Sequence, residues 1–323
     1  MEYEKKIKVL SGIIVLLLAL YIVGTIFSSG NINRRRVSQP IIGNAFANRI
    51  SAIRVDMLEG DIFFHKEDGS WFYTHNGKKY PAAESRIENF IDIISKLKKN
   101  QIAASNSRSW DRFDILDGET KDAIFYDSSN NELFRLHVGK RGPVRGGGEY
   151  IRTSLSEEVY LLDAPILRFF QGDFNFWSNL RVLPEGIDNT TITAVRVRTD
   201  NSFGGGLGML NFLMREEHIS NDFEWRDSAS GKAINRNSAN MLLNNIAALT
   251  GDSFSEEYII DRNAEIEIET VYGRFIIDIK LFEGPEDRSY LFGIRGSDYR
   301  YTSSSFRIER ILGSVKEINE ELN

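Results

Sequence analysis

Apolar and polar residues alternate in short runs that predict β-strands, and apolar residues recur at helical spacing in a few longer runs. Residues 50–55 (ISAIRV) have a close copy at 192–197 (ITAVRV). After each copy come a strand around a tryptophan (Trp71, then Trp225), an apolar-striped helix and further strands. A repeat of ~140 residues is too long for a solenoid unit and has the size of a domain. The pattern therefore predicts two tandem α+β modules that arose by duplication.

In the first module, the dipeptide Asp68-Gly69 predicts a β-hairpin. Helical spacing then predicts one long helix with a single buried stripe: Ile87, Phe90, Ile91, Ile94 and Leu97. Strands are predicted beyond this helix at 123–126, 133–138, 149–152 and 159–162. Asp163 is placed to cap a short closing helix. Strands, one helix and more strands indicate a mostly antiparallel sheet.

The second module repeats this order. Its helical stripe, at Leu242, Leu243, Ile246 and Leu249, aligns with that of the first helix without a gap. Residues 264–270 (AEIEIET) alternate strictly, so we expect a strand with one buried face and one solvated face. The carboxylates of that strand, Glu265, Glu267 and Glu269, are expected on the solvated face, too widely spaced for shared calcium coordination. A last helix is predicted to begin near residues 303–305.

The N-terminus carries an uncharged apolar run at 9–27, which as a helix spans a bilayer core of roughly 30 Å. We predict a transmembrane anchor there, after a tail at 1–8 and before a polar linker at 28–48. A cleaved signal peptide and a buried core helix are the alternatives. The apolar stretch of a signal peptide is usually shorter, and a core helix is usually amphipathic. Lysines before the run and the arginines at 34–36 after it nearly balance, so charge alone does not decide the orientation.

The modules are expected to occupy residues 49–185 and 190–323. A net charge of -6, with no cationic stripe beyond the N-terminal region, argues against a nucleic-acid partner. The chain has no cysteine, which excludes disulfides, thiol catalysis and thiolate metal sites.

Residues with catalytic potential do not form a recognisable motif. The four histidines, His65, His75, His137 and His218, lack metal-ligand spacing. The glycine runs at 142–148 and 204–208 match no phosphate-binding pattern and are typical of hairpin loops. Trp110 and Trp177 could belong to a glycan platform, although aromatic residues more often pack in a core. We therefore predict no catalytic, cofactor-binding or metal-ligating residues and no cofactor.

Several landmarks, taken in order after an N-terminal anchor, resemble the domain-of-unknown-function family 4340. They are Ile50-x-x-Ile53-x-Val55, Asp68-Gly-x-Trp71, Pro81-Ala-Ala, Trp110-x-x-Phe113, Leu136-x-Val-Gly139, Tyr150-Ile-Arg152 and Val159-Tyr160. They cover roughly residues 50–180, and the second module resembles the pattern more weakly. Members commonly have a glycine after the aromatic residue near Phe113, where this chain has Asp114.

Members of this family are membrane-anchored bacterial proteins, often encoded beside the permease, ATPase and substrate-binding-like subunits of gliding-type ABC transporters. The resemblance implies a single-pass protein of the cytoplasmic (inner) membrane with most of the chain extracytoplasmic. We expect a non-enzymatic auxiliary subunit of an ABC-type export or gliding-associated complex, with the lipid bilayer, the permease and companion envelope subunits as partners. One alternative is an envelope-facing glycan or peptidoglycan binding module, which requires an exposed aromatic row. Another is an envelope hydrolase, which requires convergent carboxylates or a nucleophile-base pair.

Overall fold

The computed structural model describes most of the chain. The described residues are 14–18, 21, 40, 42–57, 60–96, 101–118, 121–143, 148–162, 165–170, 172–200, 210–217, 223–283 and 288–322. The predicted anchor at 9–27 lies outside them except for residues 14–18 and 21, which are helical. The tail at 1–8 and most of the linker at 28–48 also lie outside. Among the described residues, no helix has both the length and the apolar character needed to cross a membrane.

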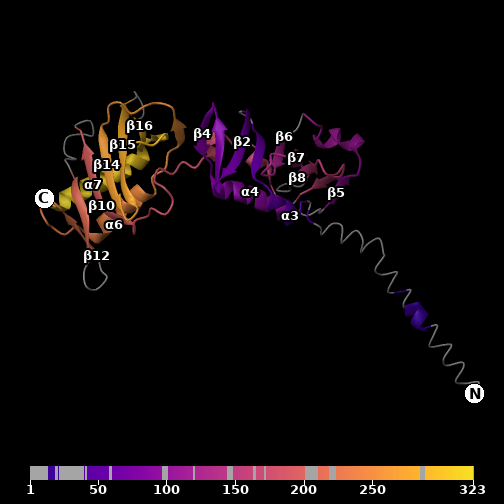
Figure 1. Cartoon of the computed structure of the whole chain (residues 1–323), viewed down its shortest axis with the longest axis horizontal. Helices are drawn as coiled ribbons and strands as arrows, with labels where there is room; N and C mark the ends of the chain where they lie inside the picture. Colours follow the sequence, from indigo (N-terminus) through magenta and orange to yellow (C-terminus); the bar gives the residue numbers. More distant parts are fainter. Residues whose placement is uncertain are drawn as a thin grey trace, which may run out of the picture. The chain divides into compact units, whose positions relative to one another are not determined.

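The chain divides into two compact units between Trp177 and Ser178. Each unit is an antiparallel sheet with its main helices packed on one face (Figure 1), so the predicted α+β class is confirmed. The division falls before the boundary predicted between residues 185 and 190.

The first unit contains a nine-stranded sheet. Its strands are β1 (Ala52–Met57), β2 (Gly60–Glu67), β3 (Ser70–His75), β4 (Lys78–Pro81), β5 (Gln101–Ala104), β6 (Lys121–Tyr126), β7 (Glu132–Arg141), β8 (Glu149–Thr153) and β9 (Val159–Leu161). Its helices are α3 (Asn44–Ala47), α4 (Glu84–Lys96) and α5 (Phe174–Trp177), with the 3₁₀ turns η1 (Ser107–Ser109), η2 (Asp111–Phe113) and η3 (Leu167–Phe169). The strand order is β4-β3-β2-β1-β6-β7-β8-β9-β5.

Two tight turns set the register at the start of this sheet. Asp68 and Gly69 have φ angles of 49° and 91°, and Glu67 pairs with Ser70. Consecutive left-handed residues are what a two-residue hairpin loop requires, so the predicted hairpin is confirmed. Asn76 and Gly77, at 52° and 75°, make an equivalent turn between β3 and β4 that we did not predict from the sequence.

Helix α4 packs its apolar stripe against the first sheet. Ile87, Phe90 and Ile94 are buried, and the Phe90 ring lies 5.8 Å from that of Phe125 on β6. A short helix closes this unit, as predicted, but α5 begins at Phe174, after the turn η3 and later than the sequence predicted. The side chain that closes this core is the buried Trp177, whose ring is 5.9 Å from Phe90. Asp163, the predicted cap, lies outside the described residues.

The second unit contains an eight-stranded sheet in the order β12-β11-β10-β14-β15-β16-β17-β13. The strands are β10 (Ile192–Thr199), β11 (Leu210–Glu217), β12 (Phe223–Asp227), β13 (Ser253–Ser255), β14 (Ala264–Thr270), β15 (Gly273–Glu283), β16 (Arg288–Ile294) and β17 (Arg300–Ser304). The helices are α6 (Arg236–Ala247) and α7 (Ser305–Leu322).

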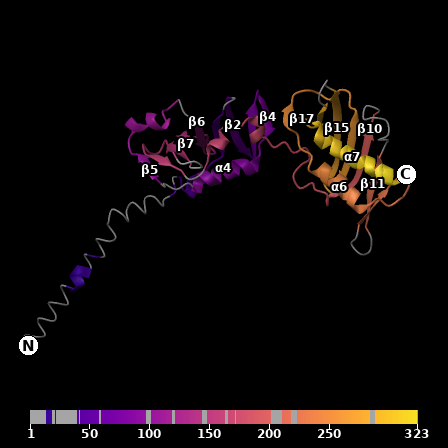
Figure 2. The same cartoon turned by 180° about the vertical axis from the view of Figure 1, so that it is seen from behind.

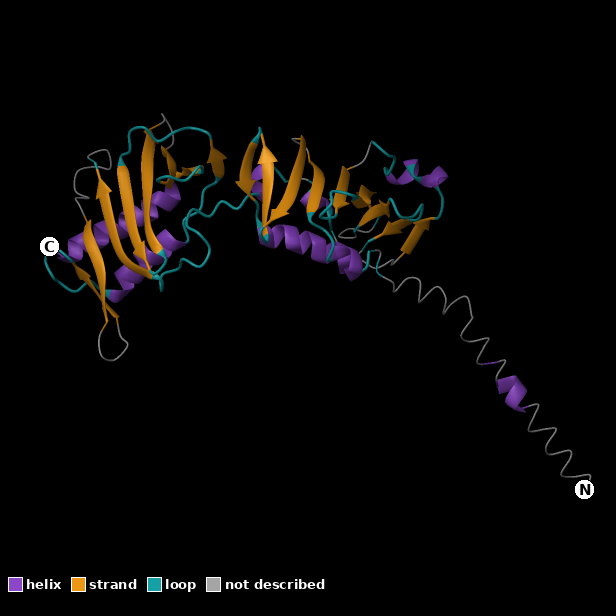
Figure 3. Ribbon diagram, viewed as in Figure 1, coloured by secondary structure: helices purple, strands orange, loops and turns teal. Residues whose placement is uncertain are grey.

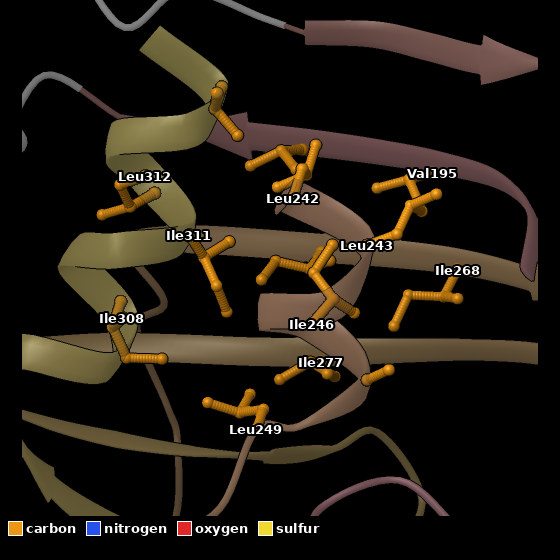
Figure 4. Close-up of a cluster of buried hydrophobic side chains, with 14 of the residues drawn as sticks. Val195, Leu242, Leu243, Ile246, Leu249, Ile268, Ile277, Ile308, Ile311 and Leu312 are labelled. Atoms are coloured by element: carbon orange, nitrogen blue, oxygen red, sulfur yellow. The ribbon is translucent and has the colours of Figure 1, made fainter. Parts of the chain in front are cut away.

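Helices α6 and α7 lie side by side on one face of the second sheet (Figures 2 and 3). Leu243 and Ile246 of α6 meet Ile311 of α7 above Val195 and the neighbouring strands (Figure 4). At 18 residues, α7 is longer than the 12-residue α6, so the expectation of a short closing helix is wrong for the second unit. It begins at Ser305, as the sequence predicted.

The two sheets follow the same path. In each, a run of hairpin-connected strands ends at one edge, and a helix (α4 or α6) then leads to a strand at the opposite edge (β5 or β13). The chain returns through a strand that pairs with the first one, β6 with β1 and β14 with β10. The remaining strands fill the sheet in sequence order up to the edge strand.

Candidate functional site

Charged side chains gather on the face of each sheet opposite its helices, which we call the open face. On β6, Phe125 packs against Phe90 of α4, so alternation places Asp122 on the open face. On β14, Ile266 and Ile268 belong to the core beneath α6 and α7, which places Glu265 and Glu267 on the open face.

The first sheet carries a row of five ionisable residues across adjacent strands, which we call the first polar row. The strand register pairs Asp56 with Asp61, Asp122 with His137, and His137 with Arg152. The pairing of Val55 with Ala123 brings Asp56 beside Asp122. Acidic residues therefore occupy β2, β1 and β6, and basic residues occupy β7 and β8.

His137 is the centre of this row. It is 2% exposed, and its Nδ1 lies 2.8 Å from Asp122 Oδ1. Its Nε2 lies 3.4 Å from Oδ1 of Asp117, a residue of the segment that follows η2. Both ring nitrogens thus face carboxylates, an arrangement that fixes the orientation of the imidazole ring.

Arg152, the last residue of the row, is buried against the ring of Trp110. Its guanidinium lies 3.7 Å from the centroid of the Trp110 ring and forms an ion pair with Asp117. Trp110 in turn donates its indole N–H to the carbonyl of Glu157 at 3.1 Å. The Trp110 side chain is therefore engaged with the charged row, and Trp177 is fully buried in the core.

The segment that carries Trp110 lies against β7 because of one glycine. A Cβ on Gly139 would lie 2.0 Å from the carbonyl oxygen of Phe113, so only glycine allows this approach. Asp114, which follows, has φ 56° and ψ 50°, a left-handed conformation. Glycine adopts this conformation without steric cost, whereas other residues seldom do.

The acidic end of the first polar row retains a proton at mildly acidic pH. Burial raises the pKa of Asp56 from 3.8 to about 6, and the hydrogen bond with Asp61 and the negative charges of Asp61 and Asp122 act in the same direction. Arg54 opposes them.

The second sheet corrects the prediction made for its glutamates. Glu265 and Glu267 are only 4% and 3% exposed, so the expectation of a solvated face is wrong for both. Glu269 is exposed as predicted. The reason is a layer of arginines that reaches over the two buried carboxylates.

We call this layer the arginine surface: Arg196, Arg198, Arg262, Arg274 and Arg295. Glu265 receives Arg198 Nη1 at 2.8 Å and Arg295 Nη2 at 2.5 Å, with Arg262 Nε at 3.3 Å. Glu267 receives Arg274 Nη2 at 2.8 Å and Arg196 Nη1 at 3.3 Å. Arg295 also binds Asp278 at 2.6 Å. The carboxylates lie beneath, and the guanidinium groups lie between them and solvent.

The arginines keep the buried Glu265 ionised. Burial would raise the pKa of Glu265, but the hydrogen bond from Arg295 and the charges of Arg295, Arg262 and Arg198 together hold it below its ordinary value. Hydrogen bonds to Asp278 and Glu265 raise the pKa of Arg295. Glu265 and Arg295 therefore stay charged over the physiological pH range.

The other residues considered from sequence do not converge on a reactive centre. His65 lies on β2 and His75 on β3, whereas His218 and the run at 204–208 lie outside the described residues, as do residues 144–147. Within the part of the chain that the structure describes, no group of three His, Asp or Glu residues could hold a metal ion. What the arrangement supports chemically is the recognition of charge.

Sequence reasoning missed the arginine surface. A signal was present, since Arg196 and Arg198 alternate along β10 as the glutamates do along β14. Strands of complementary charge at the same period are candidates for pairing.

One family model matches the chain. It is described as Domain of unknown function (DUF4340), and it covers residues 71–263, more than half of the sequence. No curated protein and no solved structure matched the chain.

Proposed function

The chain belongs to the DUF4340 family, and we propose that it is a non-enzymatic, membrane-anchored auxiliary subunit of an ABC-type export or gliding-associated transport complex. In this proposal residues 9–27 cross the cytoplasmic membrane once and the two units are extracytoplasmic. The uncharged apolar run at 9–27 supports the anchor. The permease and companion envelope subunits are the proposed partners.

The observation that carries the proposal is the charged open face in each unit. Helices cover one face of each sheet, and the opposite face holds ionisable side chains that are paired with one another. In the first unit His137 and Arg152 are themselves buried, whereas in the second unit the arginines are partly exposed. A face of this kind suits the docking of another protein, because it combines fixed charges with a rigid backbone.

We further propose that the two units arose by duplication, which would double the binding surface. The matching strand order supports this, as does the placement of the ISAIRV and ITAVRV segments on β1 and β10. The charged positions also correspond. Val55 and Val197 end the two repeated segments; Val55 pairs with Ala123, the neighbour of Asp122, and Val197 pairs with Ile266, the neighbour of Glu265.

The anchor and its orientation can be tested on the full-length protein in its own cells. We expect it to remain in the membrane fraction after carbonate washing, and protease added to spheroplasts should degrade residues 50–323. Crosslinking in intact cells should then join it to an ABC permease subunit. Release by carbonate would contradict the anchor, protection from protease would contradict the orientation, and an absence of permease in the crosslinked products would contradict the transporter role.

A glycan or peptidoglycan binding module is the second candidate, and one observation favours it. Aromatic rings form a strip across the open face of the first sheet: Phe72, His65, Phe63 and Tyr126, all half-buried. Neighbouring ring centroids along it are 6.0–6.3 Å apart. Rings at such spacing can stack against successive sugar faces.

Co-sedimentation with isolated peptidoglycan distinguishes this candidate. Phe63→Leu keeps the apolar volume but removes the ring, so it should reduce sedimentation if the strip binds glycan. Phe306→Leu, which changes an exposed ring of α7, is the matched control. Equal sedimentation of both variants and the parent protein would exclude the strip as the binding site.

A further inference from the structure

We propose that the arginine surface of the second unit binds an extended acidic segment of a partner protein. The inference rests on the proposed binding role of the open faces and does not require the membrane anchor. An experiment can therefore disprove the binding of an acidic segment without disproving the membrane anchor, and the reverse.

The charges on this face are layered. Glu265, Glu267 and Asp278 are at most 15% exposed, so the negative charge lies deep. Four of the arginines are 42–57% exposed, and Arg196 is 23% exposed. Because the outer layer is cationic, an approaching partner meets positive charge first, and a partner of negative charge is complementary to it.

The buried carboxylates also hold the guanidinium groups in place. Arg198, for example, is bound to Glu265 through Nη1, and Arg274 is bound to Glu267 through Nη2. A guanidinium has five N–H donors in a planar fork, so one such contact orients the side chain and leaves donors for a second carboxylate. Pre-orientation lowers the entropy lost when a partner binds.

The spacing of the arginines suits an extended chain. Arg196 and Arg198 occupy alternate positions on β10, which are about 7 Å apart on one face of a strand. Carboxylates at alternate positions of an extended peptide have the same spacing. Arg274 and Arg295 lie at the strands beyond β14, so the surface extends across the sheet as well as along it.

The residue types favour a protein partner over a lipid surface. Protein interfaces are enriched in arginine and tyrosine, and depleted in lysine. The cations bound to Glu265 and Glu267 are all arginines. Exposed tyrosines lie before and after β14 in sequence, Tyr258 at 78% and Tyr272 at 69%.

Fluorescence anisotropy with the full-length protein in a nonionic detergent tests the proposal. The probe is a labelled short peptide of alternating Glu and Thr, with a Gln-Thr peptide as the uncharged control. The test variant is the double change Arg262→Gln and Arg274→Gln. It is chosen because Glu265 retains Arg198 and Arg295, and Glu267 retains Arg196. The matched control is Arg49→Gln with Arg86→Gln, two exposed arginines of the first unit.

We expect the Glu-Thr peptide alone to bind, with an affinity that falls as salt is raised. The test variant should weaken binding about tenfold, and the control variant should leave it unchanged. Glu269→Gln, which removes the exposed carboxylate of the same face, should strengthen binding. This gain keeps the test decisive even if the double variant folds poorly.

Three results would overturn the proposal. The first is an absence of binding by the Glu-Thr peptide, and the second is equal loss in the test and control variants. The third is binding only to phosphatidylcholine vesicles that contain phosphatidylserine, with loss in the test variant. That result would identify the arginine surface as a lipid-binding face.

Discussion

Arg274 reaches from β15 to the buried Glu267 of β14, with Nη2 2.8 Å from the carboxylate oxygen Oε1. Arg196 approaches the other oxygen from β10. Glu267 thus compensates two positive charges while it is itself removed from water. Glu267→Ala should lower the free energy of unfolding by about 2–3 kcal/mol, because the arginines lose their counter-charge and a cavity forms beneath them. Urea denaturation monitored by tryptophan fluorescence measures the change.

Glu269→Ala is the matched control on the same strand and face. Its carboxylate is exposed, so the loss should stay within about 0.5 kcal/mol. Similar losses for the two variants would show that Glu267 is solvated after all.

Shortening a buried apolar side chain in the core of the second unit should lower the free energy of unfolding by as much as Glu267→Ala or more. Leu243 is fully buried between α6 and the sheet (Figure 4), and we expect Leu243→Ala to lower the free energy of unfolding by about 2–5 kcal/mol. Ile94 of α4 is 1% exposed, and Ile94→Ala should lower the free energy of unfolding of the first unit by a comparable amount. Met241→Ala, at a 44% exposed position of α6, serves as control and should be nearly neutral. A large loss of stability in Met241→Ala would show that α6 buries a different face from the one described.

The raised pKa of Asp56 predicts a pH dependence of stability. Between its ordinary pKa of 3.8 and about 6, the folded protein binds a proton that the unfolded chain releases. Stability should therefore fall as pH rises through this interval. Asp56→Asn should remove that fall and stabilise the protein at neutral pH by about 1 kcal/mol, a figure reduced for solvent screening of this half-buried group. Denaturation midpoints at several pH values test it, and a variant with the same pH profile as the parent protein would count against the raised pKa of Asp56.

Asp114 offers a test of backbone strain. Its left-handed conformation is free of steric cost only for glycine. Asp114→Gly should leave stability unchanged or raise it by up to about 1 kcal/mol, whereas Asp114→Val should lower it by about 1–2 kcal/mol. Thermal unfolding compares the two. If valine were tolerated as well as glycine, the turn after η2 would have to adopt another conformation.

The features that sequence predicted correctly are local ones. The stripe of α4 follows from side chains within three turns of one another, and the hairpin at Asp68 follows from two adjacent residues. The alternation in β14 likewise identified the strand and its buried Ile266 and Ile268. In each of these cases the residues that determine the structure are neighbours in the chain.

The features that sequence missed depend on distant residues. The burial of Glu265 is produced by Arg198 and Arg295, which are separated from it along the chain and meet it only through strand pairing. The row from Asp61 to Arg152 likewise requires the register of five strands. The start of the closing helix after β9 was mispredicted, because Trp177 fills the core from the four-residue α5 and no helical stripe marks that role in the sequence.

The edge position of β13 has a consequence for the order in which the chain can be completed during synthesis. Among the described strands, β13 pairs with β17 alone, and β14, β15 and β16 are all made between them. In the first sheet β5 likewise pairs with β9, which is made after β6, β7 and β8. A ribosome-bound chain therefore exposes the backbone of β5 and of β13 until the last strand of the respective sheet has emerged, and exposed edges are sites of wrong pairing. A chain released before β17 cannot finish its second sheet, whatever the stability of the strands already made.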